Sequence, residues 1–178
     1  MRNLIYAVAT SLDNFIADPD GNIEMFPREG PHIEDYVEEL LSYDTVIMGK
    51  NTYEFGYRQG LEEGVSLYPF MRNYVYSESL SFQPTDENLK IITSDSLGHI
   101  RLLKSYEGKP ILLCGGGKLA GALIKQGLID ELHLRICPIT LNTGIPMLGD
   151  FKGNVRLDEL SKQEYENNVS FVKYKILT

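Results

Sequence analysis

Hydrophobic positions follow two different patterns along the chain, and the difference predicts the kind of sheet that the chain forms. Three runs are apolar almost without a break, namely residues 4–9, 45–48 and 111–114. Strands that are covered on both faces read in this way, which is typical of a parallel sheet between layers of helices. In residues 132–137 and 171–176, apolar and polar residues alternate instead. This alternation predicts half-exposed antiparallel strands, with His133 and Arg135 on the exposed side.

Between these strands, hydrophobic side chains recur every three or four residues, which predicts helices. In residues 33–41 the spacing predicts an amphipathic helix, and its expected core face consists of Ile33, Tyr36, Val37, Leu40 and Leu41. Two more helices are expected over 118–127 and 97–106, and two shorter strands over 73–77 and 89–93. The order predicts one α/β domain over residues 1–178, whose mixed sheet has a parallel centre and an antiparallel C-terminal hairpin.

The charge of the chain restricts its partners. Its 178 residues carry a formal net charge of −8. Nucleic acids and anionic membrane surfaces are bound by clustered Lys and Arg side chains, so neither is expected as a partner. No apolar stretch approaches the roughly 20 residues that a membrane-spanning helix needs. The apolar run near the N-terminus is too short for a signal peptide and is interpreted as the first strand.

Neither the cysteines nor the histidines have the spacing of a metal site. Cys114 and Cys137 lie inside apolar runs. This position favours reduced core residues and a cytoplasmic protein, with a disulfide or a redox pair as the alternative. His32, His99 and His133 are scattered along the chain. We therefore expect no bound metal.

Three consecutive glycines follow the third apolar run, in the stretch ILLCGGGKLAGALI. A strand, a glycine turn and a helix start together present free backbone N–H groups and the positive end of a helix dipole, which suits an anion. Gly115, Gly117 and Ala120 match G-x-G-x-x-A, but a complete dinucleotide-binding unit would also place an acidic residue at the end of the next strand. The turn is not a Walker A loop, because Leu119 stands where Ser or Thr is required.

A similar turn occurs earlier, in TVIMGKNTYEF. A buried strand again leads to a glycine, a lysine and a helix start, with Asn51 or Thr52 as the expected N-cap. Two such helix starts at the carboxyl ends of parallel strands can share one crevice, where open α/β sheets bind ligands. A pyrophosphate suits that crevice. The alternative is two ordinary strand-to-helix turns.

The order of the motifs resembles the dihydrofolate reductase-like family, and within it the RibD C-terminal (riboflavin biosynthesis reductase) type. The motifs are SLDNFIADPDG, IMGKNTYE, CGGGKLAGALI, GLIDELHLRICPITL and TGIPML. The resemblance implies a three-layer fold, an NADPH cofactor, a homodimer and reduction of a small pteridine-, pyrimidine- or ribityl/ribosyl-type substrate. Relatives of this kind include 5-amino-6-(5-phosphoribosylamino)uracil reductase. The alternative is a nucleotide-binding module or structural dimer that has lost catalysis.

The resemblance also assigns roles to individual residues. In the first turn, the cofactor phosphates would be held by Gly49, Lys50, Asn51 and Thr52. In the second turn, the residues that would wrap the pyrophosphate and lie by the nicotinamide ribose are Gly115, Gly116, Gly117, Lys118 and Leu119. Ala9 and Ile16 would face the nicotinamide, and Ser77 would lie near the adenosine end. Glu78 would then oppose a 2′-phosphate, which Lys50 could offset, unless Glu78 points into solvent.

Departures from the family pattern concern the substrate. The chain contains no Trp, and Ile33 occupies the position of the acidic residue that binds the pterin in dihydrofolate reductases. Glu34 or Asp35 could serve only in a shifted register, which argues against folate as the substrate. In the first loop, Asn14 replaces the usual Gly, and Asp13 is the polar residue expected to meet the substrate. The proton donor is left open between Asp13, Glu34, Asp35 and an ordered water.

Overall fold

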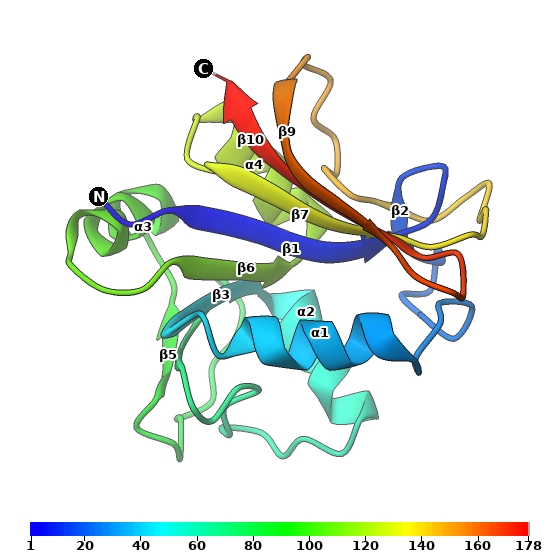
Figure 1. The fold of residues 1–178 in the computed structure, drawn as a ribbon. Coiled ribbons are helices and arrows are strands. Elements are labelled where there is room, and N and C mark those ends of the chain that lie inside the picture. The colour runs from blue at the N-terminus through cyan, green and yellow to red at the C-terminus, as the bar shows by residue number, and fades with distance from the viewer. Residues whose placement is uncertain (178) are drawn as a thin grey trace.

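An eight-stranded sheet runs through the centre of the protein (Figure 1). The computed structural model describes residues 1–177. In sheet order the strands are β5 (Leu89–Ile92), β4 (Arg72–Tyr76), β3 (Thr45–Gly49), β6 (Ile111–Gly115), β1 (Leu4–Thr10), β7 (Glu131–Ile136), β10 (Ser170–Leu177) and β9 (Arg156–Glu164). The three apolar runs are β3, β6 and β1, which lie side by side and pair in parallel. The predicted parallel centre is therefore confirmed.

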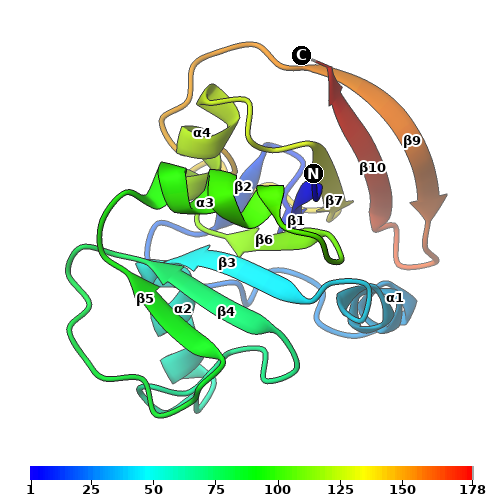
Figure 2. The same ribbon diagram turned by 90° about the vertical axis from the view of Figure 1, so that its left-hand side faces the viewer.

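Two layers of helices cover the sheet, and they form the three-layer arrangement that was expected. On one face lie α1 (Pro31–Leu40) and α2 (Lys50–Arg58), and on the other lie α3 (Ser96–Ser105) and α4 (Gly117–Lys125), as Figure 2 shows. Alternate residues of the central strands pack against each layer. In β1, Ile5 and Ala7 pack against α1 and α2, whereas Leu4 and Tyr6 pack against α3 and α4.

The prediction of half-exposed strands was wrong for β7. His133 and Arg135 are each only 4% exposed. The strand pairs in parallel with β1 as well as antiparallel with β10, so it lies inside the sheet, and α1 covers the face that carries both side chains. A carboxylate on α1, Glu39, contacts both side chains. The alternation of polar and apolar residues in β7 therefore marks a buried ion pair and not a solvent-exposed face.

The same ion pair shifts the inward face of α1. Val37 and Leu41 were expected in the core but are 57% and 63% exposed, whereas Leu40 is buried as expected. His32 is also buried at the start of the helix. Because Glu39 points to the sheet, the face of α1 that packs inward differs from the face predicted from the apolar residues. A pattern of apolar residues alone cannot reveal a buried carboxylate.

Two details at the ends of elements also differ from expectation. The N-cap of α2 is Gly49 and not Asn51 or Thr52, because the helix already begins at Lys50. The C-terminal hairpin is present, but its partners are β9 and β10. The sequence pattern did not predict β9, because every residue of this edge strand is exposed and the strand has no buried face to impose alternation.

A small second sheet lies at the carboxyl end of β1. It consists of β2 (Phe15–Ala17) and β8 (Ile145–Pro146), which pair antiparallel. Asn14 adopts a left-handed conformation (φ 66°). Asn tolerates this conformation better than most residues other than glycine, so Asn14 can replace the usual glycine of this loop. The amide of Met147 donates to the Asn14 carbonyl at 3.0 Å, and the Tyr6 hydroxyl donates to the Met147 carbonyl at 2.9 Å. These bonds fix the first loop beside the central sheet.

Candidate functional site

The residues expected to bind a cofactor follow one edge of the sheet. Ser77 comes directly after β4, Gly49 ends β3, Gly115 ends β6 and Ala9 lies near the end of β1. These four strands are consecutive neighbours in the sheet and all point the same way. Since adjacent strands lie about 4.8 Å apart, the row spans about 14 Å. Such a row has the shape needed for an extended ligand rather than a compact one.

The two glycine turns face each other at the middle of this row. A Cβ atom built on Gly116 would lie 3.5 Å from Thr52 Oγ1 and 3.7 Å from the Gly49 nitrogen. The first residue of α2 follows Gly49 and the first residue of α4 follows Gly116, and in neither case does a side chain cap the helix. The first three N–H groups of each helix lack an acceptor within the helix, and both dipoles end here. The arrangement can bind an anion between two helix starts.

Glycine is required in the second turn for two different physical reasons. Gly115 (φ 155°) and Gly116 (φ 97°) adopt backbone conformations that favour glycine. Gly117 has an ordinary helical conformation, but a Cβ there would collide with the Pro146 carbonyl. Gly117 is therefore needed to pack α4 against the segment after β8.

Gly49 is different from these, because its missing side chain is not explained by packing or by strain. Its φ of −84° and ψ of 168° suit any residue. Apart from Gly49 and its two chain neighbours, no heavy atom of residues 1–177 lies within 4 Å of the position that a Cβ on Gly49 would take. An open space therefore adjoins the backbone between the two helix starts.

Ser77 lies at the other end of the row. Its hydroxyl accepts hydrogen bonds from the amides of Ser79 and Leu80, and its own amide donates to the Ile92 carbonyl at 3.1 Å. The Lys50 ammonium donates to the Ser79 hydroxyl at 3.1 Å. A hollow of about 510 Å³ lies next to this segment, between the end of β5 and α3, with Ile92 among its walls. Lys50 contacts this segment through Ser79, and the hollow borders Ile92, to which Ser77 is bonded. The resemblance assigns this segment to the adenosine end of the cofactor.

The remaining residues that the resemblance assigns to cofactor binding are spread around the turns. Asn51 and Lys118 are exposed, while Leu119 is half-buried and packs on the layer of α3 and α4. Ala9 is half-buried near the end of β1, and Ile16 is half-buried on β2. No two of these side chains form a hydrogen bond with each other in the described part of the chain, so their proposed shared role rests on position.

Asp13 anchors the first loop. Its carboxylate accepts hydrogen bonds from the Ser11 hydroxyl at 2.6 Å and from the backbone amides of Leu141 and Asn142, at 3.1 and 2.7 Å. The Ser11 bond, together with the two amide bonds, holds the pKa of Asp13 below its ordinary value. At neutral pH the group is therefore ionised and carries no proton to donate. A catalytic role for Asp13 stays a prediction.

Three protic side chains meet on the α1 side of the sheet. The Tyr36 hydroxyl lies 3.2 Å from the Tyr68 hydroxyl, which lies 3.0 Å from the Cys114 Sγ. All three side chains are half-buried. Burial raises the pKa of each of the three groups, so each keeps its proton at neutral pH. Cys114 directly precedes the triple-glycine turn, so the cluster adjoins the anion site.

Glu39 is the centre of a buried charge cluster beneath α1. Its carboxylate lies 2.5 Å from His133 Nδ1, 2.6 Å from an Arg135 guanidinium nitrogen and 3.4 Å from Lys173 Nζ. Burial opposes ionisation, but the hydrogen bonds and charges of His133 and Arg135 prevail and lower the pKa of Glu39 to about 2. The cluster fixes α1 to β7 and β10.

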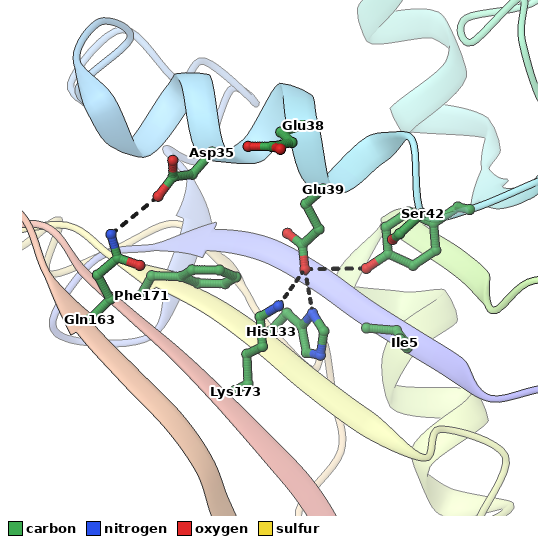
Figure 3. A pocket seen from close by; sticks show the side chains of 10 residues that line it. Ile5, Asp35, Glu38, Glu39, Ser42, His133, Gln163, Phe171 and Lys173 are labelled. Atoms are coloured by element: carbon green, nitrogen blue, oxygen red, sulfur yellow. Dashed lines mark hydrogen bonds and ion pairs between the residues drawn. The ribbon is translucent and has the colours of Figure 1, made fainter.

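A cavity of about 410 Å³ borders this cluster (Figure 3). Asp35, Glu38 and Glu39 of α1 form one wall, and His133 and Lys173 form the opposite one. The two carboxylates named as substitutes for a pterin-binding acid do not face the glycine turns. Asp35 accepts hydrogen bonds from Tyr165 at 2.6 Å and Gln163 at 3.2 Å, towards the C-terminal hairpin, and Glu34 is exposed.

Comparison with known proteins identifies the family. The sequence profile of the RibD C-terminal domain matches residues 2–171. The chain belongs to the RibD C-terminal domain family. The uncharacterized protein YwjB of Bacillus subtilis (strain 168) is 29% identical over 160 residues, which cover 88% of each chain.

Solved structures with the same fold include known reductases. One is the diaminohydroxyphosphoribosylaminopyrimidine deaminase/5-amino-6-(5-phosphoribosylamino)uracil reductase of Thermotoga maritima (TM-score 0.72, 17% identity, 99% of this chain and 57% of that one). Another is dihydrofolate reductase from Enterococcus faecalis complexed with NADP(H) (TM-score 0.70, 15% identity, 99% and 97%). At these identities the likeness shows the fold, which is the dihydrofolate reductase-like fold expected from the sequence.

Within residues 1–177, no three His, Cys, Asp or Glu side chains gather closely enough to hold a metal ion. None of the helices in that range has the length and apolar character needed to cross a bilayer. The two cysteines are both free thiols.

Proposed function

We propose that this member of the RibD C-terminal domain family is an NADPH-dependent reductase of a small pteridine-, pyrimidine- or ribityl/ribosyl-type compound. One observation carries the proposal. Two uncapped helix starts face each other across Gly49 and Gly116, at the carboxyl ends of adjacent parallel strands. This is the geometry that binds a pyrophosphate through backbone N–H groups and helix dipoles.

The residues present fit a dinucleotide. The open space beside Gly49 leaves backbone accessible to a phosphate, and Thr52 adds a hydroxyl next to the glycine turn. Lys50 and Ser77 would hold the phosphate at the adenosine end, with the hollow beside β5 taking the adenine. Ala9 and Ile16 would leave room for the nicotinamide. Because the chain carries a net charge of −8, it repels an anionic cofactor at long range, and local attraction at the two turns and Lys50 has to overcome this repulsion.

Bound NADPH would supply a hydride, and the protein's part is to orient the cofactor, exclude water and deliver a proton. The apolar packing of the α1 and α2 face limits water at the end of β1 and β6. The ionised Asp13 would hold the first loop in place. Proton delivery falls to groups that retain a proton at neutral pH, which the Tyr36, Tyr68 and Cys114 cluster does.

The proposal extends to assembly and location. We infer a homodimer, supported by the exposed apolar side chains that the β9–β10 hairpin carries at the edge of the sheet, namely Leu157, Leu160 and Leu177. The free thiols of Cys114 and Cys137 are the state that a reducing compartment maintains, which supports a cytoplasmic location. Sedimentation equilibrium tests the dimer, since a monomer over the whole concentration range would contradict it.

The experiment that tests the function is a titration of NADPH followed by oxidation assays. Fluorescence of bound NADPH measures the affinity, and loss of absorbance with pteridine and aminouracil compounds measures turnover. Binding with turnover of one of these classes supports the proposal. Binding without any turnover would favour the nucleotide-binding module, and absence of binding would overturn both.

A further inference from the structure

The strand β9 forms one edge of the eight-stranded sheet, and only one of its two sides is paired. It hydrogen-bonds with β10 alone, so its outer side is open in the part of the chain that the structure describes. Its nine residues make it the longest strand in that part, and every one of them is exposed. Figure 2 shows it as the outermost strand of the C-terminal hairpin. An open edge of this length is a template for pairing with another strand.

An extra residue interrupts β9 and restricts which strands can pair with it. Ser161 pairs with Lys173. Glu159 pairs with the next residue of β10, Tyr174, so Leu160 has no partner there. Such a bulge protects a sheet edge, because a regular strand loses its register at the extra residue. An antiparallel second copy of β9 carries the same extra residue, and the two interruptions coincide when the pairing is centred on them.

The bulge also decides which side chains of β9 share a face of the sheet. Directly opposite residues of an antiparallel pair lie on one face, as do alternate residues of a regular strand. Val172 and Tyr174 are alternate residues of β10, and their partners on β9 are Lys162 and Glu159. Glu159 and Lys162 therefore share a face, although they are three positions apart. It is the face on which Tyr174 packs towards the layer of α3 and α4.

One register of two antiparallel copies keeps these faces together and matches their charges. In it, Glu159 lies opposite Lys162 of the second copy, and by symmetry Lys162 lies opposite Glu159 of that copy. Leu157 lies opposite Glu164, and the centre of the pairing falls directly after Leu160. If the copy moved by two residues, Glu159 would lie opposite Glu164 instead. Like charges directly opposite each other are destabilising, which favours the first register.

The charged side chains of β9 are available for such a contact. Lys162 Nζ lies 2.7 Å from Glu164 Oε1, and both side chains are at least half exposed. Glu159 is exposed and enters none of the ion pairs within residues 1–177. Two copies with a net charge of −8 each repel one another at long range, so their association requires local attraction. The register that pairs Glu159 with Lys162 provides this attraction twice.

We propose that β9 is the surface through which two copies of this chain associate, and that they pair antiparallel about Leu160 to join their sheets into one. The inference rests on the homodimer of the proposed function and adds to it the strand, the register and the charge pairs. Three strands separate β9 from β6, which carries the triple-glycine turn. The pairing therefore leaves both cofactor turns open, and association and cofactor binding can be tested separately.

Two single variants and their mixture test the register. Glu159→Lys sets two lysines against each other at each contact, and Lys162→Glu sets two glutamates against each other. Each variant alone should have a dimer dissociation constant at least about tenfold higher than the wild type. In an equimolar mixture each copy supplies the sign that the other lacks, so the mixed dimer should be at least about tenfold tighter than either variant alone. Sedimentation equilibrium measures all three constants.

Lys90→Glu is the control. Lys90 is exposed on β5, at the opposite edge of the sheet, and its substitution changes the net charge as much as Lys162→Glu does. It should leave the dissociation constant of the dimer unchanged. Thermal unfolding verifies that each variant is folded, as expected for exposed side chains. A dimer that both β9 variants leave intact, or a mixture no tighter than its components, would overturn the inference.

The same samples separate this inference from the reductase proposal. NADPH affinity is measured on each of them by cofactor fluorescence. A dimer that responds to the β9 charges but does not bind NADPH would retain the interface and overturn the reductase. A protein that binds NADPH but is a monomer at every concentration, or a dimer indifferent to the β9 charges, would do the reverse.

Discussion

The ammonium group of Lys50 lies 3.1 Å from the hydroxyl of Ser79 and joins the start of α2 to the segment that follows β4. The same ammonium lies 3.6 Å from Glu54 on its own helix. Because Ser77 and Glu78 directly precede Ser79, this contact brings a cation to the place where the sequence expects the adenosine phosphate. Glu78 itself is exposed.

Lys50 should therefore set the preference between the two nicotinamide nucleotides. We expect Lys50→Gln to weaken NADPH binding by about tenfold and NADH binding much less, since only NADPH carries the 2′-phosphate. Glu78→Arg should raise NADPH affinity and leave NADH affinity nearly unchanged. Lys125→Gln, at the far end of α4, is the charge-matched control. Equal effects on both cofactors would show that neither residue meets that phosphate.

Glu39 should govern stability in acid. Its lowered pKa means that the ionised form stabilises the fold above the ordinary carboxyl pKa, and that this contribution is lost as the pH falls towards about 2. Glu39→Gln leaves the buried Arg135 without its carboxylate partner, so it should cost about 3 kcal/mol of unfolding free energy at neutral pH. Between about pH 4.5 and 2, the unfolding free energy of Glu39→Gln should also fall less than that of the wild type.

Urea unfolding over this pH range measures both effects, with Glu38→Gln as the control. Glu38 is the exposed neighbour on the same helix. A Glu39→Gln protein as stable as the control at neutral pH, or with the full acid dependence of the wild type, would contradict this role.

Dihydrofolate should be a poor substrate. The resemblance puts Ile33 at the position of the pterin-binding acid. Asp35 faces the C-terminal hairpin, and Glu39 is engaged by His133, Arg135 and Lys173. We expect kcat with dihydrofolate to lie far below the common enzyme value of about 10 s⁻¹. NADPH oxidation measures it, with NADPH binding verified in the same sample. Rapid turnover that Asp35→Asn abolishes would show that this carboxylate does reach the pterin.

Gly117 should be required for folding rather than for the cofactor. A Cβ at this residue would meet the Pro146 carbonyl, which is backbone and cannot move aside cheaply. We expect Gly117→Ala to lower the unfolding free energy by about 1–3 kcal/mol. Thermal unfolding compared with Gly49→Ala measures this loss. A Gly117→Ala protein as stable as the wild type would show that the segment after β8 can shift.

The sequence predicted the features that depend on local pattern. Uninterrupted apolar runs identified β1, β3 and β6, and glycine followed by lysine identified both helix starts at the sheet edge. Features that depend on partners distant in the chain were missed. His133 and Arg135 look exposed until Glu39, about 95 residues earlier, covers them.

The cluster of Tyr36, Tyr68 and Cys114 shows the same limit. Cys114 was interpreted as a core residue, and Tyr68 lies in a loop without periodicity, so no pattern connects them to Tyr36. The one available signal was the position of Cys114 immediately before the triple glycine. Asp13 was singled out as the polar residue expected to meet the substrate, and that role stays a prediction. Its bonds to residues 141 and 142 depend on the fold.

The most direct test of the reductase proposal is the NADPH affinity of Gly49→Ala. The backbone at this residue suits alanine, and apart from Gly49 and its two chain neighbours no heavy atom of residues 1–177 lies within 4 Å of the new Cβ, so the variant should fold like the wild type. Gly116→Val is less informative, because φ at Gly116 is 97° and strain would accompany any side chain. We predict that Gly49→Ala keeps its thermal stability and weakens NADPH binding by at least about tenfold, or 1.4 kcal/mol. A stable variant that binds NADPH as tightly as the wild type would contradict the account.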